Sequence, residues 1–168
     1  TSSTCLASSI VNNIGSAETQ GIEVDATYLL DAWALSLSAS YMDTARTNTR
    51  LPLEVGERLP YAAQTNANAG LQYNFTMNGY SGFIRTDLSY VGKYASAPAW
   101  FSFPDGGDYV DASLHLGITM NHWDLTIYGT NLTGNDGARL SRGGSSGIPI
   151  AEIRAVPRRL GVKIGYSF

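Results

Sequence analysis

The sequence predicts an all-β protein, an antiparallel transmembrane β-barrel, and three observations lead to this prediction. First, apolar and polar residues alternate with a period of two along seven segments, as expected of strands that separate two different environments. Second, the links between these segments are alternately short and long. Third, only 15% of the 168 residues are charged, against about 25% in an average soluble domain.

The predicted strands have about the length that a tilted strand needs to cross a bilayer. In the third of them, for example, Ala67 and Leu71 alternate with Asn66 and Gln72. No segment shows the 3.6-residue period of a helix, and no run of about 18 apolar residues is present to form a membrane-spanning helix. The seven segments are 20–30, 33–41, 64–75, 84–90, 109–120, 123–128 and 160–168.

Short links at 31–32, 77–79 and 121–122 alternate strictly with long links at about 46–62, 95–108 and 133–154. The second short link contains Asn78-Gly79, a strong hairpin signal. Outer-membrane barrels combine short periplasmic turns with longer extracellular loops, so the long links are predicted to lie outside the cell. The Gly-rich run 141–147 lacks the Lys-Ser/Thr ending of a phosphate-binding loop and is predicted to be a flexible part of the longest loop.

The alternation is compatible with apolar side chains that face lipid or that line a soluble ligand-binding barrel. The polar side chains favour the first alternative, because they suit a water-filled lumen better than a Lys- and Glu-rich soluble exterior. Aromatic residues near the strand ends fit an interfacial girdle: Trp33, Tyr41, Tyr73, Phe75, Tyr94, Trp123, Tyr166 and Phe168. The residues predicted to face the lumen are Glu23, Asp25, Arg85, Asp87, Asp111, His115 and Lys163.

The residue pattern argues against an enzyme or a metal protein. Glu23 and Asp25 share a face at i, i+2, but we interpret them as lumen lining balanced by Arg85, Arg159 and Lys163 rather than as an acid–base pair. The two histidines are predicted to lie apart, His115 in the lumen and His122 in a periplasmic turn. No Ser/His/Asp set lies on one face.

Charge and cysteine content exclude two further features. The net charge is -3 without a basic block, so nothing indicates nucleic acid. Cys5 is the only cysteine, which excludes an internal disulfide. Its role is left open between a free thiol in a mobile N-terminal segment and pairing with a partner further upstream.

Four segments together resemble the C-terminal barrel strands of TonB-dependent outer-membrane receptors. In the stretch NNIGSAETQGIEVD at 12–25 the residues that match the family are Gly21, Ile22 and Glu23, and GERLP at 56–60 precedes an Asn-rich strand ending in LQYNF. The stretch WDLTIYGTNLTG ends its strand with Asn131 and Leu132, and PRRLGVKIGYSF resembles the terminal strand. Each motif is weak alone, but their order and spacing cover the chain from about Asn12 onward.

The resemblance implies that residues 1–168 are the last seven or eight strands of a barrel of about 22 strands, without the N-terminal plug domain. It implies uptake of a scarce nutrient, most commonly a ferric siderophore or similar chelate, without a cofactor. The implied partners are outer-membrane lipid and lipopolysaccharide, the remainder of the receptor chain, and TonB through the absent N-terminal part. The barrel assembly machinery is expected to recognise the terminal aromatic Phe168.

Five loop residues are candidates for ligand contact: Trp100, Phe101, Phe103, Arg139 and Arg142. Exposed aromatics stack on ligands and arginines bind carboxylates, although packing between loops or contact with lipopolysaccharide phosphates would also explain them. One alternative architecture is a small complete eight-stranded barrel, acting as anchor or adhesin, in which residues 6–14 supply the eighth strand.

Overall fold

The computed structural model describes all residues except 1–14, 50–54, 98–103, 137 and 144–148. For 49, 138–143 and 149–152 it describes the backbone alone. The described residues form strands, turns and links, which confirms the all-β prediction. No helix long and apolar enough to cross a membrane occurs among them.

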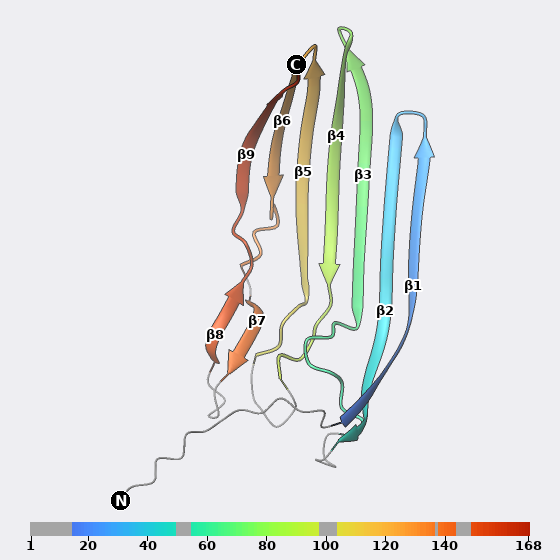
Figure 1. Ribbon diagram of the computed structural model, residues 1–168, viewed down its shortest axis with the longest axis vertical. Coiled ribbons are helices and arrows are strands. Elements are labelled where there is room, and N and C mark those ends of the chain that lie inside the picture. Colours follow the sequence, from blue (N-terminus) through green and yellow to red (C-terminus); the bar gives the residue numbers. More distant parts are fainter. Residues whose placement is uncertain (1–14, 50–54, 98–103, 137, 144–148) are drawn as a thin grey trace, which may run out of the picture.

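Seven strands form one antiparallel sheet in the order β1-β2-β3-β4-β5-β6-β9 (Figure 1). Each strand pairs with its neighbour in the sequence, except that β9 follows β6 in space. All seven predicted strands are present. Their bounds are Gly15–Leu30 (β1), Trp33–Thr49 (β2), Thr65–Met77 (β3), Tyr80–Val91 (β4), Tyr109–Met120 (β5), Trp123–Thr130 (β6) and Arg159–Tyr166 (β9).

The hairpin of β1 and β2 is longer than the alternation predicts. Pairing continues from Leu30↔Trp33 at the turn to Gly15↔Thr49 at the far end. The extension carries polar side chains on both faces, such as Glu18 and Gln20 on one and Thr19 on the other. Alternation disappears where both faces of a strand meet the same environment, so the sequence pattern stops before the strands do.

The link 133–154 was predicted as a loop and instead contains a second, two-stranded sheet. Strands β7 (Ala138–Gly143) and β8 (Pro149–Arg154) pair antiparallel, with Leu140 opposite Ile153. Six-residue strands with two register irregularities leave no readable period of two. Of the run predicted to be flexible, 141–143 belongs to β7 and 144–147 lies outside the described residues.

The three short links are tight turns, as predicted. Asp31, Asn78 and Asn121 have positive φ angles of 48°, 52° and 53°. Asn and Asp tolerate this left-handed conformation better than other residues with a side chain. Asn78 is followed by Gly79 at φ 82°, the pair of left-handed residues that a type I′ hairpin turn requires.

The register places most of the apolar residues of the seven strands on one face, with exceptions such as Leu29 and Phe83 on the other. Residues directly opposite each other share a face, and the pairs Ala39↔Ala67, Ala69↔Leu88 and Ile127↔Val162 continue this face across the sheet. We call it the apolar face and the opposite one the polar face.

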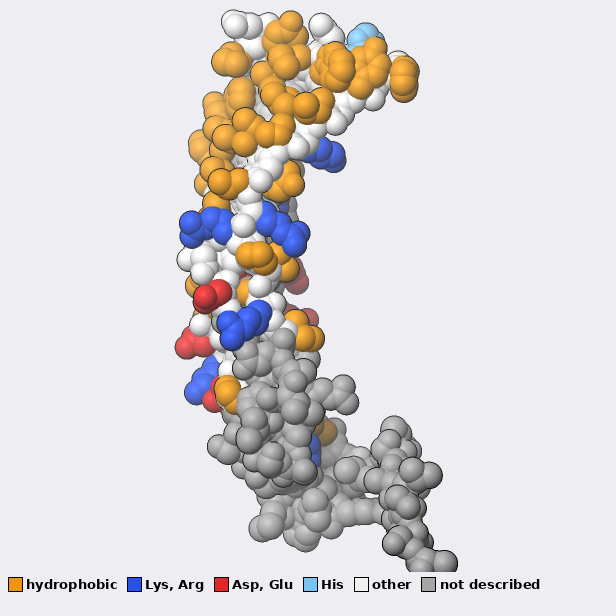
Figure 2. Space-filling model, turned by 90° about the vertical axis from the view of Figure 1, so that its left-hand side faces the viewer, with side chains coloured by type: hydrophobic (Ala, Val, Ile, Leu, Met, Phe, Trp, Pro, Cys, Tyr) orange, Lys and Arg blue, Asp and Glu red, His pale blue; other side chains and the backbone are white. Residues whose placement is uncertain are grey.

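The apolar face has no protein partner within the described chain. Ile22 and Leu160 are 71% and 78% exposed, and among the described hydrophobic residues only Ala63 is buried. A contiguous exposed apolar surface marks a binding partner or a membrane. Seen from the β9 side, hydrophobic side chains dominate the part of the sheet nearest the tight turns, whereas most of the charged side chains in view lie further from these turns (Figure 2).

Two aromatic clusters lie at the tight-turn end of the sheet. Trp33 and Tyr73 face each other across β2 and β3, with ring centroids 4.6 Å apart. Trp123 lies 4.7 Å from Tyr166, which in turn meets Phe168 edge-on at 5.2 Å. The predicted concentration of aromatics at strand ends is therefore present at this end.

The two edge strands, β1 and β9, run in the same direction (Figure 1). In a sheet of seven antiparallel strands the first and the last are parallel to each other, so β1 and β9 cannot pair with each other to close an all-antiparallel barrel. Closure requires an odd number of further strands between β9 and β1. Residues 6–14, the eighth strand in the small-barrel alternative, lie outside the described residues.

Candidate ligand-facing site on the polar face

All seven residues predicted to face the lumen lie on the polar face. Five of them lie in three rows of cross-strand pairs: Glu23↔Ser40, Asp25↔Ser38↔Asn68↔Ser89↔Asp111 and Arg85↔His115↔Tyr128. Asp87 lies two residues beyond Arg85 on the same strand, and Lys163 is opposite Thr126. Sequence alternation was sufficient to place them on a common face.

Arg85 and Asp87 form a two-pronged ion pair on β4. The Arg85 Nε donates to Asp87 Oδ2 at 2.9 Å, and Nη2 donates to Oδ1 at 2.5 Å. The fork of the guanidinium matches the two carboxylate oxygens, which fixes both side chains. The interpretation that Arg85 balances Glu23 and Asp25 is wrong, because they lie on β1, three strands away.

Glu23 and Asp25 have no ion-pair partner among the described residues. Both side chains are exposed on the edge strand β1. A carboxylate without a cation nearby is stable only where water can reach it. This part of the polar face is therefore hydrated.

Neutral polar groups fill the space between the charged ones. Asn68 Nδ2 donates to Ser38 Oγ at 3.2 Å, and Gln72 Nε2 donates to Asn74 Oδ1 at 2.8 Å. Ser36 Oγ donates to the Gly70 carbonyl at 3.4 Å. The polar face thus offers a surface of hydroxyl and amide groups rather than a concentration of one charge.

Asn131 joins the end of β6 to the chain that leads into β9. Its Nδ2 donates to the carbonyl oxygens of Asn135 at 2.7 Å and Val156 at 2.8 Å, and its Oδ1 accepts from the Asn135 amide at 2.9 Å. Arg158 adds a hydrogen bond from Nη2 to the Leu132 carbonyl at 2.9 Å. Asn131 is 9% exposed and has a φ of 49°. Its side chain is buried and hydrogen-bonded within the protein, so it holds this junction together and is not available to a ligand.

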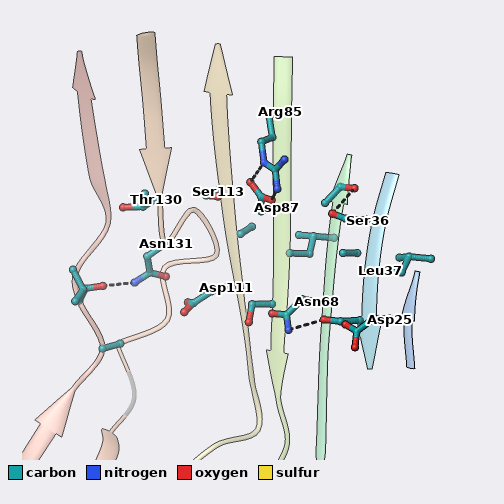
Figure 3. A pocket seen from close by; sticks show the side chains of 18 of the residues that line it. Asp25, Ser36, Leu37, Asn68, Arg85, Asp87, Asp111, Ser113, Thr130 and Asn131 are labelled. Atoms are coloured by element: carbon teal, nitrogen blue, oxygen red, sulfur yellow. Dashed lines mark hydrogen bonds and ion pairs between the residues drawn. The ribbon is translucent and has the colours of Figure 1, made fainter. Parts of the chain in front are cut away.

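The polar face is hollowed beside this junction. The hollow has a volume of about 760 Å³ and reaches from β1 to the chain between β8 and β9 (Figure 3). We call it the polar hollow; Asp25, Ser38, Asn68, Arg85, Asp87, Asp111, Ser113, Thr130, Asn131 and 153–156 line it. No pattern in the sequence indicated that 153–156 line this hollow, although the Asn131-Leu132 motif contains the residue that holds this segment.

The two histidines lie apart, as predicted. His115 stacks on Tyr128 on the polar face, with ring centroids 6.1 Å apart. His122 is in the turn between β5 and β6, 5.9 Å from the Tyr166 ring. Within the described part of the chain, no group of three His, Cys, Asp or Glu side chains is placed to hold a metal ion.

The candidate loop residues are not brought into the hollow by any described contact. Trp100, Phe101 and Phe103 lie outside the described residues, as does Cys5. Arg139 and Arg142 belong to β7, of which the backbone alone is described. Ligand contact by these five loop residues stays a prediction.

A sheet of membrane-spanning length with one exposed apolar face and one hydrated polar face is a wall segment of a transmembrane β-barrel. The sequence profile described as TonB dependent receptor-like, beta-barrel, matches residues 1–132. The chain belongs to this family. Proteins of this family are outer-membrane transporters in which the barrel works with a plug and TonB.

A solved structure shows the same fold. The chain is similar to the ferric yersiniabactin uptake receptor FyuA from Yersinia pestis, with a TM-score of 0.81 and 16% sequence identity. The similarity covers 93% of this chain and 24% of that one, so the chain spans about a quarter of its length. Among curated proteins, none matches. The predicted family and fold class are confirmed.

Proposed function

We propose that this chain is the C-terminal barrel wall of a receptor that takes up a scarce nutrient with energy supplied through TonB. The observation that carries the proposal is the two-faced sheet in a chain of this family: the polar face would line the transport lumen and the apolar face would meet lipid. The polar hollow is then a recess in the lumen wall. The most common cargo expected from the family is a ferric siderophore or a similar chelate.

The proposal includes a longer polypeptide. Two observations support it: the chain spans 24% of the FyuA chain, and its seven-stranded sheet needs an odd number of further strands to close. An unpaired strand edge in lipid would leave backbone groups without hydrogen bonds. The remaining strands, the plug and the segment that contacts TonB would come from the rest of the receptor chain.

The intact mass of the native polypeptide from outer membranes tests this part of the proposal. A mass several times the 18.0 kDa of this chain, with a plug sequence upstream, is the expected result. A mature protein of about the same mass as this chain would instead support the anchor or adhesin alternative.

The tight-turn end would face the periplasm and the long links the exterior. The aromatic clusters around Trp33 and Trp123 support this orientation, since aromatic residues anchor barrels at the membrane interface. Phe168, 109% exposed, is available at that end to the barrel assembly machinery. A Phe168→Ala receptor should accumulate in the periplasm, whereas an unchanged amount of folded receptor in outer membranes would remove this role.

Uptake by living cells tests the cargo. Cells with and without the receptor gene would be given ⁵⁵Fe-labelled siderophores of several classes, labelled cobalamin and labelled oligosaccharides. The expected result is loss of uptake of one iron chelate, both on deletion of the gene and on inactivation of TonB. Normal uptake of all probes without the gene would refute a transport function, and loss of a different probe would replace the siderophore as cargo.

A further inference from the structure

Hydroxyl groups are the commonest polar groups in the lining of the polar hollow. A hydroxyl carries no charge and both donates and accepts hydrogen bonds. The amide of Asn68 adds a neutral group of the same kind. The lining therefore matches a ligand that has its own hydroxyl and amide groups. The six hydroxyls belong to Thr27, Ser36, Ser38, Ser89, Ser113 and Thr130.

Both arginines that line the hollow already have partners within the protein. The Arg85 and Asp87 side chains point toward each other (Figure 3), and two hydrogen bonds from Arg85 Nε and Nη2 join them. Arg154, the other arginine of the lining, is also engaged within the chain. Neither guanidinium therefore needs a negative charge from a ligand.

Gly70 allows the ion pair to lie close against the sheet. It is opposite Asp87 on the neighbouring strand β3. A Cβ at this position would come within 2.9 Å of Asp87 Oδ1, 3.0 Å of Arg85 Nη2 and 2.6 Å of Ser36 Oγ. The pair therefore lies over bare backbone, where the positive charge of Arg85 is directed at Asp87 along the wall.

Carboxylates outnumber guanidinium groups in the lining. Asp25, Asp87 and Asp111 line the hollow together with the two arginines. Asp25 is exposed and has no ion-pair partner among the described residues. An anion in the hollow would lose water next to an excess of negative charge, or would have to displace Asp87 from Arg85, and both are costly.

The hollow lies toward the long-link end of the sheet. Asn131 directly follows β6 at this end, and Asp111 is close to the start of β5. In the orientation proposed above, this end faces the exterior. Cargo that enters from outside would therefore reach the hollow before it reaches the tight-turn end.

We propose that the polar hollow contacts the cargo during uptake and selects a cargo that is uncharged and rich in hydroxyl and amide groups. This inference rests on the proposed transport function and narrows its cargo class. A neutral ferric tris-hydroxamate and an uncharged oligosaccharide share the required chemistry. A ferric tris-catecholate does not, because its doubly charged ligands leave an excess of negative charge on the complex.

Uptake rates provide the test. Cells that carry the full-length receptor, and no other receptor for the probes, would be given the two chelates labelled with ⁵⁵Fe and a labelled neutral oligosaccharide. We expect one neutral probe to enter about tenfold faster than the tris-catecholate, since a hydrogen bond to a charged group corresponds to a factor of about this size. Which neutral probe enters identifies the source of the shared chemistry.

Asp87→Asn provides a sharper test, because it removes the carboxylate that neutralises Arg85. The freed guanidinium should raise the ratio of tris-catecholate uptake to neutral uptake by about tenfold. Addition of Arg85→Gln to this variant should return the ratio to its native value. Asp124→Asn is the matched control: it removes a carboxylate of the polar face outside the hollow that bonds the Thr119 hydroxyl, so it frees no cation.

The amount of folded receptor in outer membranes is measured for every variant, so that rates are compared per receptor. A native receptor that prefers the tris-catecholate would overturn the inference. So would a ratio that Asp87→Asn leaves unchanged or that Asp124→Asn raises equally. Either result would leave transport itself intact, whereas uptake of every probe that does not depend on the receptor gene would refute the transport function and this inference with it.

Discussion

The side-chain amide of Asn131 donates a hydrogen bond to the Val156 carbonyl oxygen at 2.8 Å, although the two residues are 25 positions apart. Between them lies the β7–β8 hairpin. The hydrogen bond therefore connects the two ends of the segment that contains this hairpin, and it holds 153–156 beside the polar hollow. Through this contact a single buried side chain determines one wall of the hollow.

Asn131→Ala should destabilise the barrel by about 1–3 kcal/mol, because two carbonyl groups and one amide lose their partner. It should also make the Arg154 and Arg158 bonds sensitive to trypsin. Urea unfolding in lipid vesicles and limited proteolysis measure the two effects. Asn131→Gly is the control, since glycine accepts the φ of 49° without the side chain. If Asn131→Gly is as stable as the native protein, the loss of stability in Asn131→Ala comes from backbone strain at a positive φ and not from the lost side-chain hydrogen bonds.

Arg85 and Asp87 should be energetically coupled, and a double-mutant cycle with Arg85→Gln and Asp87→Asn measures the coupling. The side chains are 40% and 35% exposed, so solvent screening limits the expected value to about 0.5–1 kcal/mol. The control cycle pairs Arg85→Gln with Glu23→Gln, which lies three strands away and should be additive. Equal coupling in both cycles would contradict a local ion pair.

Leu88→Lys and Ser89→Lys should have opposite outcomes although the residues are adjacent. Leu88 is on the apolar face and 47% exposed, whereas Ser89 lines the polar hollow. A lysine on the lipid face should cost about 2–4 kcal/mol near the bilayer centre, and one on the polar face should be tolerated. Folding into vesicles, followed by the mobility of unheated samples on gels, measures the difference. Equal folding of both variants would show that the faces are assigned wrongly.

Gly161→Ala should destabilise the sheet because Tyr128 covers this glycine. A Cβ on Gly161 would come within 2.5 Å of Tyr128 Cζ, which requires the ring to move at a cost of about 1–3 kcal/mol. Gly165→Ala is the control on the same strand and face, since its Cβ would meet Asp124 Cβ at an ordinary 3.5 Å. Tyr128→Ala should restore tolerance of Gly161→Ala. An equal effect of the two alanine substitutions would point to chain entropy instead of the ring.

The accuracy of the sequence predictions follows the environment of each segment. Between Trp33 and Tyr41 one face meets apolar surroundings and the other meets water, so the alternation reveals the strand. Beyond Tyr41 most residues of β2 are polar whichever face they lie on, and Met42 and Ala45 interrupt the alternation, so the sequence does not reveal that the strand continues to Thr49. Strands β7 and β8 were not predicted either, because they are short and their pairing is irregular, so no period of two can be read from their residues.

The sequence by itself determined the strands within the apolar band, their tight turns and the face on which Glu23, Arg85 and Lys163 lie. A period of two in side-chain direction contains that information locally. Only the tertiary structure decided that Arg85 binds Asp87, that Asn131 holds 153–156, and that Arg58 and Lys93 line one pocket. These relationships depend on the register between strands and on contacts between residues far apart in the sequence, and no local pattern specifies either.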